Sequence, residues 1–162
     1  MKQTLKLNKH PSINSGLASR ILALCEGEWD KISIMATVVG ELYQEVDGFD
    51  WVGFYRVVEP NLLKIGPYQG GHGCLVIPFA RGVCGAAARS QKIQIIDDVK
   101  KFDGHIACSE STRSELVIPC FDQNSELLGV LDIDSDQPAF FTNHDADFLD
   151  QLMRKLFMGK QI

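Results

Sequence analysis

The sequence has neither a long hydrophobic run nor an excess of positive charge. No apolar stretch approaches the roughly 18 residues that a membrane-spanning helix needs, and residues 1–9 lack the apolar centre of a secretory signal. The formal net charge is −5, which argues against a nucleic-acid footprint and against a polybasic, membrane-binding surface. These absences predict a cytoplasmic protein that binds neither nucleic acid nor membrane, and they leave a small or cationic partner open.

Internal repeats, low-complexity tracts and a linker that could divide the chain are also missing. The 162 residues are 45% hydrophobic and 23% charged, which is ordinary for a globular protein. A chain of this length can bury about two thirds of its unfolded surface in one core. We therefore expect a single catalytic or binding domain over residues 1–162.

The cysteines are numerous, with five in the chain, but no two of them form a Cys-x-x-Cys pair. Cytosolic disulfides are usually transient, and either catalytic or redox-sensing, so widely spaced thiols suggest redox chemistry. A zinc site is the alternative, although structural zinc sites usually draw their ligands from closely spaced pairs. Its ligands would be Cys74, Cys84 and Cys108 with His72 or His105.

Apolar residues at helical spacing predict helices at both ends of the chain. Ser15 is expected to cap a first helix that ends near Cys25, and Asp30 is expected to cap a second. Thr142-Asn-His-Asp145 is a variant of the capping box and predicts the start of the last helix. The expected apolar face of the second helix consists of Ile32, Met35, Ala36, Val39, Leu42, Tyr43 and Val46.

Between these helices, β-branched and aromatic residues predict strands, two pairs of which form hairpins. Residues 66–73 contain four glycines and a proline and are expected to form a loop, while the small residues at 82–89 predict a short helix. This order predicts an α+β fold, with a central antiparallel sheet of about six strands and helices packed on its faces. The predicted strands are residues 51–58, 62–65, 74–79, 92–97, 115–121 and 127–134.

Residues 103–115 are the stretch best suited to chemistry, with Cys108 at its centre. A cysteine becomes nucleophilic when cations or helix amides lower its pKa and leave it partly exposed. The polar neighbours of Cys108 favour that role, although a free cysteine often packs as a small hydrophobic residue. Cys84 falls near the start of the predicted helix at 82–89, where the helix dipole would favour a thiolate.

Acidic residues gather on the predicted strand at 127–134. Asp132 and Asp134 are two residues apart and therefore point to the same face. Desolvated carboxylates need a partner, which can be the ammonium group of a ligand or a structural salt bridge, and the sequence leaves both open. On the strand at 51–58, the same alternation places Trp51 and Tyr55 on one face.

Six motifs in order resemble the free methionine-(R)-sulfoxide reductases, a family of stand-alone GAF-domain enzymes. The resemblance spans nearly the whole chain. It implies a GAF-like catalytic domain that reduces the free amino acid to methionine, with thioredoxin as electron donor, no cofactor, and a homodimeric state. The motifs are Trp51-Val-Gly-Phe-Tyr, Gly66-Pro-Tyr-Gln-Gly, Gly82-Val-Cys-Gly, Gly104-His-Ile-Ala-Cys, Ser114-Glu and Gly129-Val-Leu-Asp-Ile-Asp-Ser.

The resemblance also assigns roles to residues. It implies that Cys108 is the catalytic cysteine, Cys74 the principal resolving cysteine, and Cys84 a third cysteine that can also form disulfides. Cys25 and Cys120 match no functional position and are expected in the core. The substrate pocket carried over from the family has Trp51 and Tyr55 as hydrophobic walls and Glu115, Asp132 and Asp134 as its polar side. One departure is the His72-Gly73 pair before Cys74, where the family has a Pro-Ala-like pair.

Sulfoxide chemistry agrees with these roles. A thiolate must attack sulfur while the oxygen takes up a proton. Glu115 and Asp134 are the candidate acids, because crowding among carboxylates raises their pKa, and Asp132 is the candidate partner of the substrate ammonium. Cys108 then becomes a sulfenic acid, which condenses with a second thiol to give a disulfide.

A non-catalytic GAF domain that senses a small ligand is the alternative function. Such a sensor is normally joined to an output domain, which is not found in these 162 residues. It would also have no need of thiols in loops and at a helix start.

Overall fold

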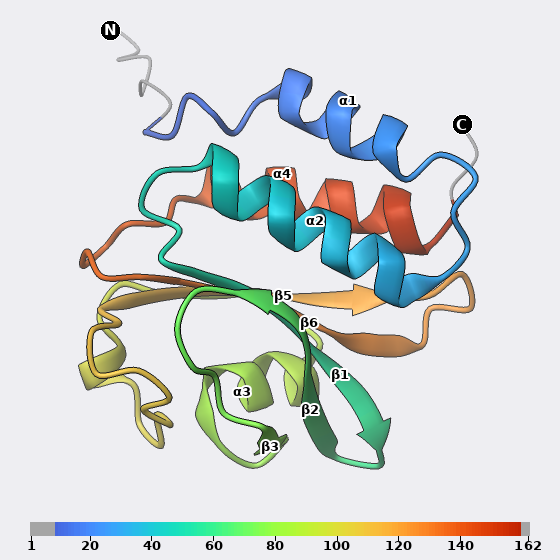
Figure 1. Cartoon of the computed structure of the whole chain (residues 1–162). Coiled ribbons are helices and arrows are strands. Elements are labelled where there is room, and N and C mark those ends of the chain that lie inside the picture. The colour runs from blue at the N-terminus through green and yellow to red at the C-terminus, as the bar shows by residue number, and fades with distance from the viewer. Residues whose placement is uncertain (1–8, 160–162) are drawn as a thin grey trace, which may run out of the picture.

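A six-stranded antiparallel sheet forms the centre of the fold (Figure 1). The computed structural model describes residues 9–159, so the segment examined for a secretory signal lies outside the described residues except for Lys9. The strand order is β3-β2-β1-β6-β5-β4, and the predicted α+β class with about six strands is confirmed. The strands are β1 (Trp51–Glu59), β2 (Leu62–Gln69), β3 (Val76–Pro78), β4 (Gln94–Ile96), β5 (Ser114–Phe121) and β6 (Leu127–Ser135).

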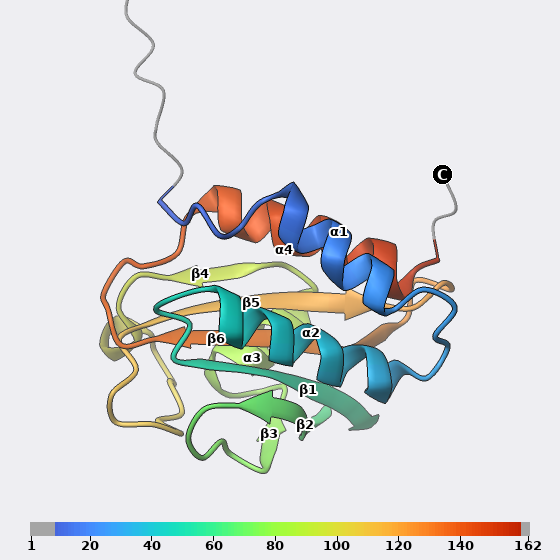
Figure 2. The ribbon, with the colours of Figure 1, turned by 45° about the horizontal axis from the view of Figure 1, so that its top comes forward.

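Helices cover both faces of the sheet (Figures 1 and 2). On one face lie α2 (Lys31–Glu45) and α4 (Asn143–Phe157), with α1 (Ser15–Leu24) on their outer side. The short helix α3 (Gly82–Ser90) covers the other face, and a 3₁₀ turn, η1 (Val99–Lys101), follows β4. Among residues 9–159, no helix has the length and apolarity needed to span a membrane. Each face therefore has its own hydrophobic core, the larger one beneath α2 and α4.

The buried stripe of helix α2 matches the predicted one only in part. Met35, Val39, Leu42 and Val46 are buried as expected, but Ile32 is 43% exposed, Tyr43 is 37% exposed and Ala36 is exposed as well. The helix carries apolar residues around most of its circumference, so periodicity alone did not fix the buried side. Packing against the sheet and α1 selects the stripe Ile34, Met35, Val38, Val39 and Leu42.

The caps of the other long helices were predicted with mixed success. Helix α1 is capped by Asn14, one residue earlier than expected, because the Asn14 side chain accepts hydrogen bonds from the amides of Gly16 and Leu17. At the start of α4 the capping box is confirmed. The Thr142 hydroxyl accepts from the Asp145 amide, and the Asp145 carboxylate accepts from the Thr142 amide.

The glycine-rich segment at 66–73 is not a loop throughout, because β2 continues to Gln69. Pairing with β1 stabilises this extension: Val52 lies opposite Gln69, and Gly53 lies opposite Tyr68. The register then shifts between Gly53 and Tyr55. The shift accommodates Pro67, which has no amide hydrogen to donate to the ladder. The loop proper begins at Gly70 and leads to Cys74.

Candidate active site

A pocket on the α3 side of the sheet gathers almost all of the predicted site residues. Seven of the eight line it, and the eighth, Cys74, is covalently joined to one of them. They come from β1, α3, β5, β6 and the loop between η1 and β5, which are far apart in the sequence. The seven lining residues are Trp51, Tyr55, Cys84, Cys108, Glu115, Asp132 and Asp134.

A disulfide joins Cys74 to Cys108 across 34 residues of sequence. The two Cα atoms are 5.3 Å apart, within the usual range for a disulfide. Both residues are half-buried, and Cys108 lies at the pocket wall. Because both thiols are consumed in this bond, the three-cysteine zinc site considered from the sequence does not form.

The loop that carries Cys108 is docked on the start of α3. The Gly82 amide donates a 3.0 Å hydrogen bond to the Gly104 carbonyl, and the Cys108 amide donates one of 3.0 Å to the Ile106 carbonyl. Gly82 has φ +70°, and a Cβ atom there would lie 3.2 Å from the Ile106 side chain. Glycine is therefore the residue that lets α3 start this close to the loop.

The three acidic residues come together because of the strand register. Glu115 on β5 lies directly opposite Asp134 on β6, and Asp134 in turn lies opposite Trp51 on β1. Two residues from Asp134 along β6, Asp132 lies opposite Gly53. Directly paired side chains share a face and lie close together, so the carboxyl groups and the indole border one pocket.

Burial changes the acidity of this cluster. It raises the pKa of Glu115 well above its ordinary value, and the negative charges of Asp132 and Asp134 raise it further. The pKa of Asp134 is also raised, first by burial and then by Asp132, Asp136 and Asp50. Burial raises the pKa of Asp132 to about 6. Burial and the neighbouring carboxyl groups therefore shift the whole cluster toward the protonated form.

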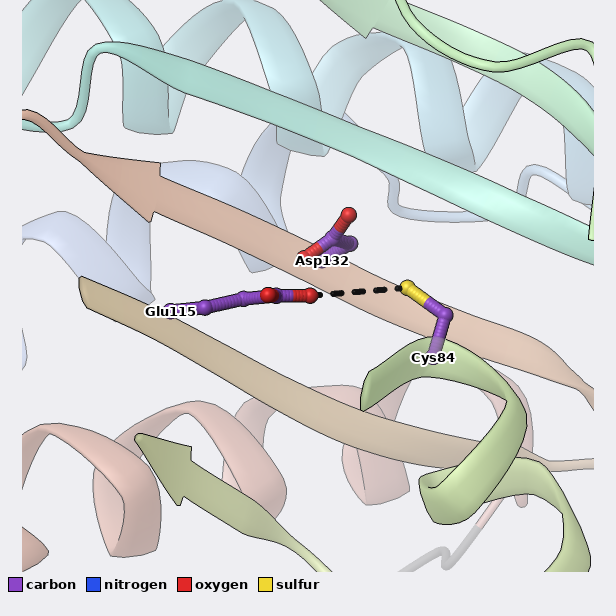
Figure 3. A group of neighbouring side chains, drawn as sticks. All are labelled: Cys84, Glu115 and Asp132. Atoms are coloured by element: carbon purple, nitrogen blue, oxygen red, sulfur yellow. Dashed lines mark hydrogen bonds between the residues drawn. The ribbon is translucent and has the colours of Figure 1, made fainter. Parts of the chain in front are cut away.

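Cys84 points from α3 into this cluster (Figure 3). Its thiol donates a hydrogen bond to Glu115 Oε1, with the two atoms 3.9 Å apart, and the residue is 3% exposed. Burial, followed by the charges of Asp132 and Glu115, raises the pKa of the thiol well above its ordinary value. The predicted thiolate at the helix start is therefore wrong, because desolvation and two carboxylates outweigh the helix dipole.

The aromatic wall is built on Trp51. Its ring stacks against Tyr55, with centroids 5.8 Å apart, and against Tyr68 at 5.4 Å. Its Nε1 donates to the Gly71 carbonyl at 3.2 Å. A Cβ atom on Gly53 would overlap the indole, so this glycine allows the ring to lie flat along β1. Burial raises the pKa of Tyr55, whose hydroxyl therefore stays protonated.

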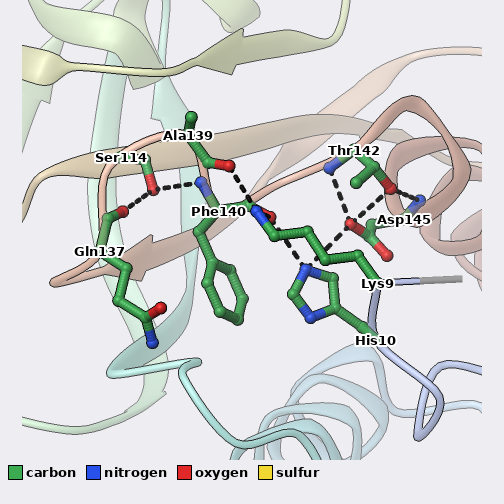
Figure 4. Close-up of polar contacts among 8 residues, drawn as sticks. All are labelled: Lys9, His10, Ser114, Gln137, Ala139, Phe140, Thr142 and Asp145. Carbon is green, nitrogen blue, oxygen red and sulfur yellow. Dashed lines mark hydrogen bonds and ion pairs between the residues drawn. The ribbon is translucent and has the colours of Figure 1, made fainter.

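The segment between β6 and α4 holds the end of the acidic strands in place (Figure 4). The Ser114 hydroxyl, next to Glu115, donates to the Gln137 carbonyl at 2.6 Å and accepts from the Phe140 amide. Lys9 Nζ donates to the Phe140 carbonyl at 2.9 Å, and His10 Nε2 lies at the same distance from that oxygen. The N-terminal end of the described chain is thus tied to the segment that supports the site.

The pocket is also lined by residues that were not predicted for the substrate site, among them two polar residues close to Cys108. His105 and Thr112 both line it, one on each side of Cys108. Burial lowers the pKa of His105, whose Nδ1 is buried with no hydrogen-bond partner among the described residues. Both residues lie within four residues of Cys108 in the sequence, and this proximity could have indicated that they line the same site. Cys25 and Cys120 lie in the core as predicted.

The fold is that of a GAF domain. The family model of the GAF domain matches residues 30–156, so the chain belongs to the GAF domain family. Over 140 residues it is 41% identical to GAF domain-containing protein A of Dictyostelium discoideum, covering 86% of this chain and 87% of that protein.

Two further comparisons show to which group of GAF-domain proteins the chain belongs. Free methionine-R-sulfoxide reductase of Escherichia coli (strain K12) is 42% identical over 134 residues, which cover 83% of this chain and 80% of that protein. The structure of free methionine-R-sulfoxide reductase from Neisseria meningitidis in complex with its substrate is 37% identical. It matches with a TM-score of 0.82 and covers 86% of this chain and 83% of that chain. The chain belongs to the free methionine-R-sulfoxide reductases, a family of oxidoreductases, and the predicted resemblance is confirmed.

Proposed function

We propose that the protein reduces free methionine (R)-sulfoxide to methionine, with Cys108 as the nucleophile and Cys74 as the resolving cysteine. The observation that carries this proposal is the Cys74–Cys108 disulfide at the wall of a pocket that combines carboxyl groups with an aromatic surface. A disulfide between these two thiols is the product that the reaction would leave on the enzyme.

In the first step, the Cys108 thiolate attacks the sulfoxide sulfur while the sulfoxide oxygen takes up one proton. The S–O bond of the substrate then breaks as this oxygen becomes bonded to the Cys108 sulfur, so methionine leaves and Cys108 is oxidised to a sulfenic acid. Glu115 and Asp134 are the proposed proton donors, because burial and neighbouring carboxylates raise the pKa of both. Burial raises the pKa of Asp132 to about 6, so at neutral pH Asp132 can pair as a carboxylate with the substrate ammonium.

In the second step, the Cys74 thiol attacks the sulfenic sulfur, so water leaves and the disulfide forms. Two electrons from a dithiol then restore both thiols, and we propose thioredoxin as their source. Cys74 follows a loop that begins at Gly70, which supports its ability to approach Cys108. Cys84 is the less suited partner, because its thiol is buried and protonated.

The wider proposal covers the whole chain. Residues 1–162 act as one catalytic domain without a cofactor, and the family resemblance supports a homodimer. The cytoplasm suits a cycle that needs reduced thiols. A sensor that binds the sulfoxide without turnover is the competing function, and it would leave the Cys108 thiol unoxidised by its ligand.

The test is methionine released from reduced enzyme after all external reductant has been removed. Cys108→Ser should release none, because a neutral hydroxyl cannot replace the thiolate. Cys74→Ser should release one methionine per active site and retain a sulfenic acid at Cys108, while thioredoxin-driven turnover falls steeply. Cys120→Ser, in the core, is the matched control and should release methionine like the wild type.

Mass spectrometry of the oxidised thiols distinguishes the outcomes. Full methionine release from Cys108→Ser, or a Cys74–Cys84 disulfide formed in that variant on adding substrate, would show that another thiol attacks. Tight sulfoxide binding by the wild type with no methionine released would establish the sensor instead.

A further inference from the structure

The polar end of the pocket holds three metal-ligand side chains from three different elements (Figure 3). Cys84 comes from α3, Glu115 from β5 and Asp132 from β6. One ligand atom of each, the Cys84 Sγ and a carboxylate oxygen of each acid, lies within 4.8 Å of the other two. All three residues are buried, so their positions are set by the packing of the elements that carry them.

The spacing is close to that of a tetrahedral zinc site. Zinc bonds of about 2.3 Å to sulfur and about 2.1 Å to oxygen place neighbouring sulfur and oxygen ligands about 3.6 Å apart. The Cys84 Sγ and Glu115 Oε1 are 3.9 Å apart. The observed separation is therefore only about 0.3 Å longer than the one that the metal requires.

A second observation shows that the cluster has unmet capacity for a cation. Asp132 Oδ1 is buried and has no hydrogen-bond partner among the described residues, and Asp132 is only 5% exposed. The ion pairs found within residues 9–159 include neither Glu115 nor Asp132 nor Asp134. A buried carboxylate oxygen without a partner is costly, and a bound cation would remove that cost.

We propose that Cys84, Glu115 and Asp132 form a binding site for a thiophilic divalent cation, Zn²⁺, which closes the polar end of the pocket to substrate. Zinc takes a thiolate and two carboxylate oxygens as ligands, and a water molecule from the pocket completes four-coordination. The protons of the Cys84 thiol and of Glu115 are released to solvent as the bonds to zinc form. No oxidation state changes in this step.

The exclusion of substrate rests on the proposed function, in which Asp132 pairs with the substrate ammonium. Zinc and the free amino acid then compete for one carboxylate, so each weakens the binding of the other. Zinc binding itself does not depend on catalysis. It also needs no thiol from Cys74 or Cys108, so the disulfide form of the protein should bind the metal.

The first experiment measures Zn²⁺ binding calorimetrically to the protein with its disulfide intact. We expect one zinc per chain, and a binding heat that varies with the ionisation enthalpy of the buffer, because protons are released. Cys84→Ser should weaken the affinity at least about tenfold, since a thiolate ligand is lost. Cys120→Ser removes another buried free thiol and is the matched control. Equal zinc affinity in Cys84→Ser and wild type would overturn the site.

A cobalt titration gives an independent readout. Co²⁺ bound by Cys84 produces a thiolate-to-cobalt charge-transfer band, which should be absent in Cys84→Ser and present in Cys120→Ser. If Cys84→Ser does not fold, as judged by circular dichroism, Asp132→Asn carries the test and should also weaken zinc binding about tenfold. A wild-type protein without the band would contradict the assignment.

Competition is tested on the same disulfide form, which cannot turn over without reductant. Free methionine (R)-sulfoxide should raise the apparent dissociation constant of Zn²⁺ more than glycine does at equal concentration. Glycine controls for chelation of zinc by any amino acid. If zinc binds at these residues but sulfoxide has no more effect than glycine, the metal site stands and the exclusion of substrate is refuted. If the wild-type protein has no reductase activity but binds zinc as expected, only the proposed function is refuted and the metal site stands.

Discussion

The Cys74–Cys108 disulfide should contribute strongly to the stability of the oxidised protein. It closes a loop across 34 residues that includes α3 and β4. Cross-linking a loop of this length lowers the entropy of the unfolded chain by an amount worth about 4 kcal/mol at 25 °C. For a domain of this size, that difference corresponds to about 8–15 °C in melting temperature.

The measurement is urea-induced unfolding of the oxidised and the reduced wild type, followed by circular dichroism. Cys74→Ser is the key comparison, since it cannot form the bond under either condition. Its free energy of unfolding should match that of the reduced wild type and should not respond to reductant. Cys120→Ser should keep the full response, because its thiol lies in the core away from the disulfide.

A difference of less than about 1 kcal/mol between the oxidised and reduced wild type would refute the reasoning. It would mean that the unfolded chain already holds the two cysteines close together, so that the bond removes little entropy. A large response to reductant in Cys74→Ser would show that a different pair of thiols is responsible.

Two further predictions concern the sheet and its acidic cluster. Gly129→Ala should lower the free energy of unfolding by about 3 kcal/mol, because the new Cβ atom would overlap the Tyr55 carbonyl oxygen. Gly40 in α2 has open space around it, so Gly40→Ala should raise the free energy of unfolding by up to about 1 kcal/mol. Equal effects of the two substitutions would contradict the close approach of β1 and β6. The pKa of Asp132 rises from 3.8 to about 6 on folding, so its ionisation destabilises the fold as pH rises through this window. With a chelator present, Asp132→Asn should therefore be more stable than wild type at pH 8, by up to about 3 kcal/mol. The gain should shrink as pH falls through this window and vanish below the unfolded pKa of 3.8. A gain that persists there would point to packing instead.

The parts of the site that the sequence could predict are those set by local periodicity. Alternation along one strand is enough to place Asp132 and Asp134 on a common face, and the same holds for Trp51 and Tyr55. Both pairs line the pocket as expected. The sequence could not show that β1 and β5 flank β6 on either side, so the alignment of Glu115, Asp134 and Trp51 in one row became visible only in the sheet.

Three of the predictions that failed depended on a partner elsewhere in the chain. Gly66-Pro67 disfavours a strand by propensity, yet β1 supplies a pairing partner and a register shift that accommodates them. Ile32 has the right spacing for a buried helical residue, but the sheet and α1 contact the stripe beside it. The Cys84 thiol has a favourable helix position, but two carboxylates from other strands decide its protonation. Each error is a tertiary contact that overrode a local preference.

The environment of the three pocket cysteines separates their chemistry. Cys74 and Cys108 lie on loops and are half-buried, so both can reach a substrate or a reductant. Cys84 is held by α3 against Glu115, and its raised pKa makes it a poor nucleophile as long as the carboxyl groups surround it. A thiol in this position is better suited to donate a hydrogen bond to Glu115, or to bind a metal that displaces its proton, than to attack a sulfenic acid. This contrast favours Cys74 as the first partner of Cys108, and it predicts that Cys84 enters a disulfide only after the acidic cluster has rearranged.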